Sequence, residues 1–322
     1  MGYWAWMMLP KPRGAFSADV FEALRAAPSR LAGTDLPEAE NADDTAIALW
    51  ALYELHFRGF DDVDDDLEWH PAVLRLRARL ESDLETRLRS HWVGTAPRGD
   101  FAETFFAFVT DHDGPSLARF VQTEATEEQV LDLLRLRSLY HLKEADPSAW
   151  VVPRLDTAPK AGLVELLYDE YGAGDPNRLH HHLFARGMEA VGLRSEYGAY
   201  VDDAPAEVLE QNNAMALLGL HRRLRGAAMG HLAAFEATSS MPSRRMAAGL
   251  ERLGLDATMI GYYTEHVTAD AAHEQVAVRA ICGALLDREP ALWDDVFFGA
   301  FTCMDPEDRV AGHLLGRWQE AA

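Results

Sequence analysis

Three polar side chains recur at helical spacing in the stretch YYTEHVTADAAHEQVA, residues 262–277. His266, Asp270 and His273 are separated by four and three residues, and at about 3.6 residues per turn these intervals place them on one face of a helix. Two imidazoles and a carboxylate on one face can bind a transition metal. They can equally form a polar stripe that faces water, and the spacing alone leaves both interpretations open.

Further acidic and histidine side chains stand in otherwise apolar stretches of the chain. A metal site in a helical bundle takes its ligands from several facing helices, so partners for residues 262–277 are expected elsewhere. Glu236 lies in the small, apolar stretch GHLAAFEATSS, which favours a carboxylate that points inward. The candidates outside residues 262–277 are Glu144, Glu170, His180 and Glu236.

Two of these candidates have rivals in the sequence. His181 and His182 flank His180 and could take its role. The Glu236 carboxylate could instead form a buried ion pair with one of three nearby arginines, which are Arg222, Arg223 and Arg225.

Three imidazoles and four carboxylates suit a pair of iron ions. Carboxylates can bridge two metals and tolerate a change in iron charge, while neutral imidazoles supply nitrogen donors. Zinc is satisfied by four ligands, and calcium prefers oxygen ligands over imidazoles. The paired Glu-x-x-His motifs of ferritin-type bundles are missing, and HEQVA at 273–277 lacks the second histidine of a zinc-protease helix.

The elements that must position these residues are predicted to be helices. Apolar residues recur at helical spacing along most of the chain, and strand-like alternation is absent. The sequence therefore predicts an all-α bundle with an N-terminal helical extension at 1–97, a main helical domain at 98–322, and a boundary at VGTAPRGD, 93–100. The predicted helices are 17–27, 43–60, 70–92, 100–112, 116–124, 126–145, 161–172, 178–192, 205–240, 242–254, 256–286 and 306–322.

Composition narrows the possible functions. The formal net charge of −22 argues against nucleic acid and anionic membrane surfaces, which bind through Lys and Arg. No apolar run approaches the roughly 18–20 residues of a membrane span, and a secretory signal is not expected. Only Cys282 and Cys303 are present, which predicts a reducing, cytoplasmic compartment without disulfides.

Two other features allow different interpretations. Trp50, Tyr53 and Phe57 recur at helical spacing in the extension and are expected either as an exposed homodimer surface or as ordinary core. A nucleophilic Cys282 in the core would indicate a thiamine-degrading or cofactor-binding relative on the same bundle, but no acid–base partner stands beside it in the sequence.

The motifs HLKEADPSAWVVPRL, KAGLVELLYDEYGAGDPNRLHHHLF, GHLAAFEATSS and YYTEHVTADAAHEQVA resemble the heme-oxygenase-like diiron oxidase and oxygenase superfamily over about residues 100–285. The family's ligand order, Glu, Glu, His, Glu, His, Asp, His, falls on seven positions of this chain. They are Glu144, Glu170, His180, Glu236, His266, Asp270 and His273.

The resemblance implies a heme-oxygenase-like helical bundle that binds two irons and uses O2 as cosubstrate through a peroxo-diferric species. It implies that Glu144 is the ligand that closes the site once oxygen is bound. Arg154, Lys160 and Asp169 are candidates for orienting the ligands, although each could be a structural ion pair.

The resemblance also implies a choice between reactions. The N-terminal extension and Glu144 are similar to the branch of the family that oxidises an amine nitrogen to a hydroxylamine or nitro group, with a small nitrogenous substrate, an external electron donor and a homodimer as expected partners. Other members cleave or desaturate aliphatic amino or fatty acids to alkenes with the same ligands. A third possibility is a helical binding or scaffold protein whose polar positions are incidental.

Overall fold

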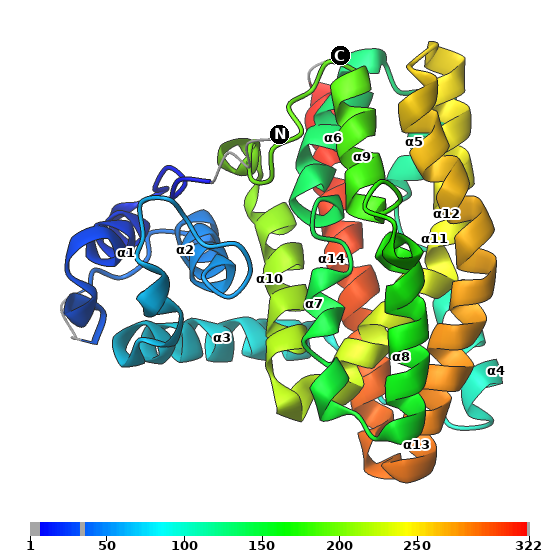
Figure 1. The fold of residues 1–322 in the computed structure, drawn as a ribbon, viewed down its shortest axis with the longest axis horizontal. Helices are drawn as coiled ribbons and strands as arrows, with labels where there is room; N and C mark the ends of the chain where they lie inside the picture. Colours follow the sequence, from blue (N-terminus) through cyan, green and yellow to red (C-terminus); the bar gives the residue numbers. More distant parts are fainter. Residues whose placement is uncertain (1–6, 33–35, 321–322) are drawn as a thin grey trace. The chain divides into compact units, whose positions relative to one another are not determined.

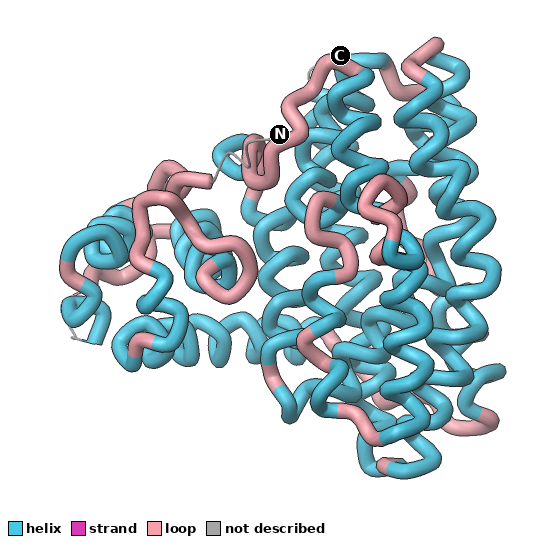
Figure 2. Tube along the Cα trace, in the orientation of Figure 1, coloured by secondary structure: helices cyan, strands magenta, loops and turns pink. Residues whose placement is uncertain are grey.

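Helices form the regular structure of the protein in the computed structural model (Figure 2). The structure describes residues 7–32 and 36–320, apart from the side chains of residue 32 and residues 268–272. No strand occurs among these described residues. The predicted all-α fold class is confirmed.

The chain divides into two compact units, and the first comprises residues 1–91 together with 196–217. Its second helix begins at an N-cap, where the Asn41 side chain accepts a hydrogen bond from the Asp44 backbone N–H. The helices of this unit are α1 (Ala15–Ala26), α2 (Ala42–Glu54), α3 (Pro71–His91) and most of α10 (Ala206–Leu220).

The aromatic side chains of the first unit do not form an exposed surface. Trp50 and Tyr53 are each only 1% exposed, and Phe57 is half-buried. The Trp50 ring packs edge-on against Phe60, with 6.2 Å between ring centroids. The interpretation of these residues as a dimer surface is therefore wrong, because α2 is buried on nearly all sides and uses them as core. A homodimer stays a prediction without this support.

The second unit comprises residues 92–195 and 218–322 and is a bundle of long helices. Figure 1 shows α11, α12 and α14 running alongside one another; α9 packs against α12, and α11 packs against α5, α12 and α14. The helices of this unit are α4 (Phe101–Thr110), α5 (Leu117–Thr123), α6 (Glu127–His141), α7 (Asp146–Ala149), α8 (Thr157–Glu170), α9 (His180–Ala190), α11 (Arg225–Leu253), α12 (Ala257–Gln275), α13 (Ala284–Arg288) and α14 (Trp293–Glu320).

Several helix boundaries differ from those predicted. The single helix expected at 205–240 ends at Leu220, because His221 adopts an extended backbone before α11 begins at Arg225. Pro242, expected to begin a new helix, lies inside α11, where burial of Met246 and Leu250 beyond it favours continuation of the helix. Pro306 likewise lies inside α14.

Two glycines bring α11 and α14 into close contact. A Cβ at Gly230 would lie 1.9 Å from the Val296 carbonyl oxygen, and a Cβ at Gly299 would lie 1.9 Å from the Ala227 carbonyl oxygen. Backbone atoms cannot move aside as the end of a flexible side chain can. The small residues of α11 therefore allow the backbones of these two helices to meet.

We expect Gly299→Ala to lower the free energy of unfolding by about 1–3 kcal/mol, because overpacking at the Ala227 carbonyl outweighs alanine's better helix propensity. Gly312→Ala is the matched control on the same helix, since no atom lies within 4 Å of the added Cβ. It should raise stability by up to about 1 kcal/mol. Chemical denaturation followed by circular dichroism measures both changes, and equal shifts of the same sign would contradict the assignment.

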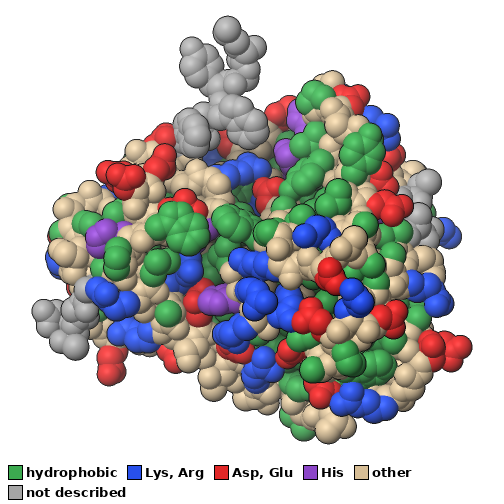
Figure 3. Space-filling model, turned by 60° about the horizontal axis from the view of Figure 1, so that its bottom comes forward, with side chains coloured by type: hydrophobic (Ala, Val, Ile, Leu, Met, Phe, Trp, Pro, Cys, Tyr) green, Lys and Arg blue, Asp and Glu red, His purple; other side chains and the backbone are tan. Residues whose placement is uncertain are grey.

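The surface carries charges of both signs. On the face drawn in Figure 3, acidic and basic side chains are interspersed with apolar ones. None of the helices within the described ranges combines the length and apolar character that crossing a bilayer requires.

Candidate metal centre

Six of the seven predicted ligands come together inside the second unit as two groups of three. Their residues are only 3–7% exposed. Within each group, one potential ligand atom from each residue lies within 4.8 Å of the others. The first group consists of Glu144, His180 and His266, and the second of Glu170, Glu236 and His273.

Glu170 connects the two groups. Its Oε2 lies 2.9 Å from Nδ1 of His180, in the first group, and its Oε1 lies 3.4 Å from Nδ1 of His273, in the second. Oε2 of Glu236 approaches the same His273 nitrogen at 3.5 Å. A carboxylate whose two oxygens reach into two groups has the arrangement of a bridging ligand between two metals.

The candidate ligands come from five separate segments. Glu144 lies in the turn at 142–145 after α6, and Glu170 is the last residue of α8. His180 is the first residue of α9, Glu236 lies midway along α11, and α12 carries both His266 and His273.

The helix that carries the histidines changes its hydrogen-bonding pattern directly after them. α12 continues into a π-helix at Val276–Gly283. Such segments are uncommon and are often found at functional sites. α8 packs against this π-helix, where a Cβ on Gly162 would lie 3.1 Å from the Ala280 carbonyl oxygen. The close approach of α8 helps to place Glu170 beside His273.

Two buried ring nitrogens point to an additional ligand. Within the described part of the chain, Nδ1 of His180 and Nδ1 of His273 make no hydrogen bond of acceptable geometry. Buried polar atoms are almost always satisfied, so such atoms call for an explanation. Their neighbours are carboxylate oxygens, and a cation between the nitrogen and oxygen donors would satisfy both. The residues therefore fit iron.

In His266 and His273, the ring nitrogen that faces away from the candidate metal position contacts a protein oxygen. Nδ1 of His266 lies 2.8 Å from the Tyr262 carbonyl oxygen, to which it can donate, and this leaves Nε2 directed to Glu144 at 3.7 Å. Nε2 of His273 lies 3.4 Å from Oδ2 of Asp169. Such contacts set the tautomer and orientation of a metal-binding imidazole. The orienting role suggested for Asp169 stays a prediction, and this contact supports it.

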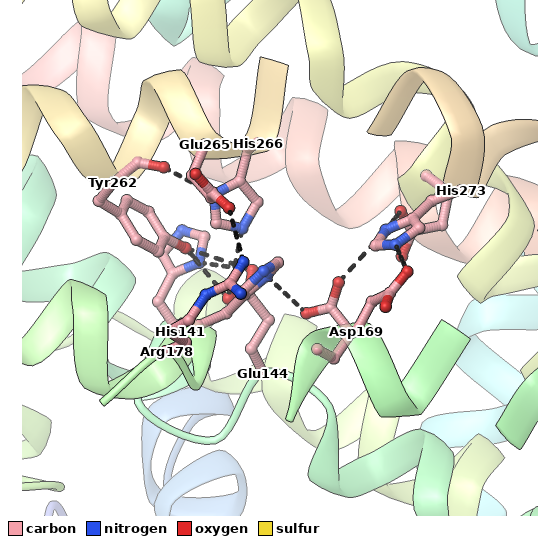
Figure 4. A network of polar contacts seen from close by, with 11 residues as sticks. His141, Glu144, Asp169, Arg178, Tyr262, Glu265, His266 and His273 are labelled. Atoms are coloured by element: carbon pink, nitrogen blue, oxygen red, sulfur yellow. Dashed lines mark hydrogen bonds and ion pairs between the residues drawn. The ribbon is translucent and has the colours of Figure 1, made fainter. Parts of the chain in front are cut away.

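His141 and Tyr262 hold the Glu144 carboxylate, and sequence reasoning did not identify either of them. Nδ1 of His141 lies 3.1 Å from Oε1 of Glu144. The Tyr262 hydroxyl lies 2.9 Å from the same His141 nitrogen and 3.1 Å from Oε2 of Glu144. Figure 4 shows the three side chains directed toward one another. The signal in the sequence was the three-residue spacing of His141 and Glu144 in HLKE.

The surroundings raise the pKa values of two of the candidate ligand histidines, His273 and His180. Burial lowers the pKa of His273, but the carboxylates of Glu236 and Glu170 outweigh it and raise this pKa to about 9. Burial and the Glu170 carboxylate likewise oppose each other at His180, where the net shift of the pKa is upward. A metal must therefore displace a proton from His273 at neutral pH.

We expect iron affinity to increase with pH, because a proton and the metal compete for His273. Below the pKa of about 9 the metal-free histidine is protonated, so its contribution strengthens binding about tenfold for each pH unit raised. Anaerobic ferrous titrations at pH 6.5, 7.0 and 7.5, with proton release measured calorimetrically, test this. An affinity independent of pH would contradict it.

The remaining predicted residues lie as follows. The side chain of Asp270, on α12, is outside the described residues. Arg154 donates a hydrogen bond to the Gly219 carbonyl oxygen at 2.6 Å, and Lys160 lies in the first turn of α8, ten positions before Glu170.

The structure also bears on the alternatives for His180, Glu236 and Cys282. His180 is buried, whereas His181 and His182 are half-buried. Arg225 pairs with Glu289 rather than with Glu236. Cys282 is fully buried, and burial raises the pKa of its thiol, which disfavours a reactive thiolate.

Comparison with known proteins identifies the family of the chain. A family model described as "iron-containing redox enzyme", of the heme-oxygenase-like group, matches residues 131–308. The chain belongs to this family of iron-containing redox enzymes, and the resemblance to the heme-oxygenase-like superfamily is confirmed.

A nitrosourea synthase from Streptomyces achromogenes subsp. streptozoticus is 30% identical over 123 residues. The match covers 38% of this chain and 26% of the synthase, so the chain spans about a quarter of that curated relative.

Proposed function

We propose that this protein is a non-heme diiron oxygenase that uses O2 to oxidise the nitrogen of a small amine. The observation that carries the proposal is the pair of buried three-residue groups joined by Glu170. Two adjacent sets of nitrogen and oxygen donors suit two irons better than one. The similarity to a nitrosourea synthase supports nitrogen as the atom oxidised.

Some of the residues would bind the metals, and others would orient the metal-binding side chains. Glu144, His180 and His266 would bind one iron and Glu236 and His273 the other, with Glu170 shared between them. When bound, the iron pair supplies the capacity to reduce O2. Asp169 orients His273, and burial of the ligands keeps bulk water from the reacting atoms.

The reaction balances with an outside reductant. An amine, O2, two electrons and two protons give a hydroxylamine and water: one oxygen atom forms the new N–O bond and the other leaves as water. The two electrons come from a donor of the ferredoxin or flavoprotein class, and further rounds would lead to the nitro level.

The test is anaerobic loading with Fe2+ followed by exposure to 18O2 and a panel of amines. We expect two irons per chain and a hydroxylamine that carries one labelled oxygen atom. Loading of one iron or none would overturn the diiron centre. Release of formaldehyde, CO2 or an alkene from the substrate would instead support carbon-chain cleavage or desaturation.

Burial of the ligands disfavours a non-catalytic scaffold. A polar stripe that merely faces water would be exposed, whereas three histidines and three glutamates lie here within the bundle. If the scaffold interpretation were correct, His266→Ala and His273→Ala would leave the iron content unchanged at background.

A further inference from the structure

A cavity of about 10 Å³ lies against both candidate ligand groups. Glu144 and His266 of the first group line it, together with Glu170 and Glu236 of the second. One water molecule needs roughly 10–15 Å³ of such space, so the cavity has room for about one. An organic amine is too large for it. The ligand that fits is therefore of about the size of water or of a diatomic gas.

The ring of Tyr140 forms part of the wall of this cavity. Tyr140 lies near the end of α6, four positions before Glu144. Its ring packs edge-to-face against Phe235 and at a tilt against His141, with 5.2 Å between ring centroids in each pair. Aromatic pairs of this geometry are stabilising. The two neighbours therefore hold the ring, and with it the hydroxyl, in one position.

The Tyr140 hydroxyl lies near carboxylates of both ligand groups. Burial raises the pKa of its phenol, and the carboxylates of Glu144, Glu236 and Glu170 raise this pKa further. Burial does not depend on the charge of the carboxylates, so the phenol keeps its proton when a bound metal offsets that charge. Among the described residues this hydroxyl donates no hydrogen bond, whereas the hydroxyl of Tyr262 lies 3.1 Å from Oε2 of Glu144.

A ligand in the cavity finds few hydrogen-bond donors. Ionised carboxylates only accept hydrogen bonds. Within the described lining, the hydroxyl groups are those of Tyr140 and the half-buried Ser148. The phenol is the better placed of the two, because it interacts with carboxylates from both ligand groups.

We propose that Tyr140 donates a hydrogen bond to a diatomic ligand held in this cavity, and that O2 is this ligand in the reaction. The inference rests on the proposed function, since the iron pair is what would bind the ligand there. Tyr140 itself would not bind iron. Its hydrogen bond would stabilise negative charge that develops on the ligand, as fixed donors do in other active sites.

Nitric oxide tests the inference, because it binds ferrous iron, has nearly the size of O2 and can be followed by its N–O stretch. Infrared spectra of the anaerobic, ferrous-loaded protein with nitric oxide are recorded in H2O and in D2O. We expect the stretch to differ between the two solvents in the starting protein and to coincide in Tyr140→Phe. This variant should load two irons and bind nitric oxide about two- to tenfold more weakly, the effect of one ordinary hydrogen bond.

Two control variants separate Tyr140 from its neighbours. Tyr263→Phe removes the hydroxyl of another buried tyrosine, which is not among the described residues that line the cavity, and should retain the solvent shift. Ser148→Ala removes the other hydroxyl of the lining and should retain it as well. Loss of the shift in Ser148→Ala, or its persistence in Tyr140→Phe, would overturn the assignment to Tyr140.

The outcomes distinguish this inference from the proposed function. If the starting protein does not load two irons, the diiron function is wrong and the inference falls with it. If it loads two irons and binds nitric oxide but shows no solvent shift, only the role of Tyr140 is overturned. Loss of iron from Tyr140→Phe alone would also overturn that role, because Tyr140 would then be needed to bind the metal.

Discussion

Replacing Glu170 with alanine is expected to weaken iron binding at both ligand groups. The loss should exceed the roughly 10–100-fold that follows when a residue hydrogen-bonded to a metal ligand is removed, because Glu170 would itself be a ligand. Its two oxygens face His180 and His273, which belong to different ligand groups. Removing the carboxylate deletes a donor from each metal position and leaves neighbouring imidazole nitrogens without their acidic partner. O2 consumption should fall to background together with iron content.

A comparison of three variants makes this prediction specific. His266→Ala removes a donor from the first group only, so about one iron per chain should remain. Glu165→Ala removes an exposed carboxylate from the same helix as Glu170 and should leave two. Anaerobic ferrous titration with elemental analysis measures all three. Retention of one iron by Glu170→Ala would show that Glu170 does not bridge the two positions.

Loss of the hydrogen bonds that hold Glu144 is expected to weaken iron binding at the first group by about 10–100-fold while sparing the second. His141→Ala removes the contact to Oε1, and Tyr262→Phe removes the hydroxyl that lies 3.1 Å from Oε2. Glu144 would then sample other rotamers and meet the metal less often in the binding orientation. The expected signature is a titration that separates into one tight and one weak equivalent of iron.

The conservative variant His141→Asn is the control, because an amide nitrogen can occupy nearly the position of the imidazole Nδ1. It should restore much of the affinity that His141→Ala loses. Thermal unfolding of the metal-free proteins reveals any general loss of structure. If His141→Ala and Tyr262→Phe weakened the binding of both irons equally, His141 and Tyr262 would not act through Glu144 alone.

The candidate ligands could be predicted from the sequence because acidic and histidine side chains stand out among apolar neighbours. Glu236 is the clearest case: its stretch GHLAAFEATSS contains no other carboxylate and no Lys or Arg, and in the structure Glu236 is only 4% exposed. His141 was missed because its place in the sequence, at a helix end between Tyr140 and Leu142, does not show what it contacts. Only the structure brings the Tyr262 hydroxyl, from another helix, to 2.9 Å from its ring nitrogen.

In the N-terminal segment, too, the sequence predicted the helix but not what its side chains contact. The apolar period around Trp50 and Tyr53 predicts a helix, and α2 is found there. Whether those rings face solvent or core depends on what packs against them. In the structure they are core, because neighbouring helices of the first unit cover them.

The sequence by itself determined that the chain is helical, where most helices lie and which polar side chains interrupt their apolar faces, because these properties depend on residues a few positions apart. Only the tertiary structure decided that Glu170 lies between His180 and His273, and that His141 and Tyr262 hold Glu144. Those contacts join residues up to 118 positions apart in the sequence. They follow from how the helices pack, which local periodicity does not specify.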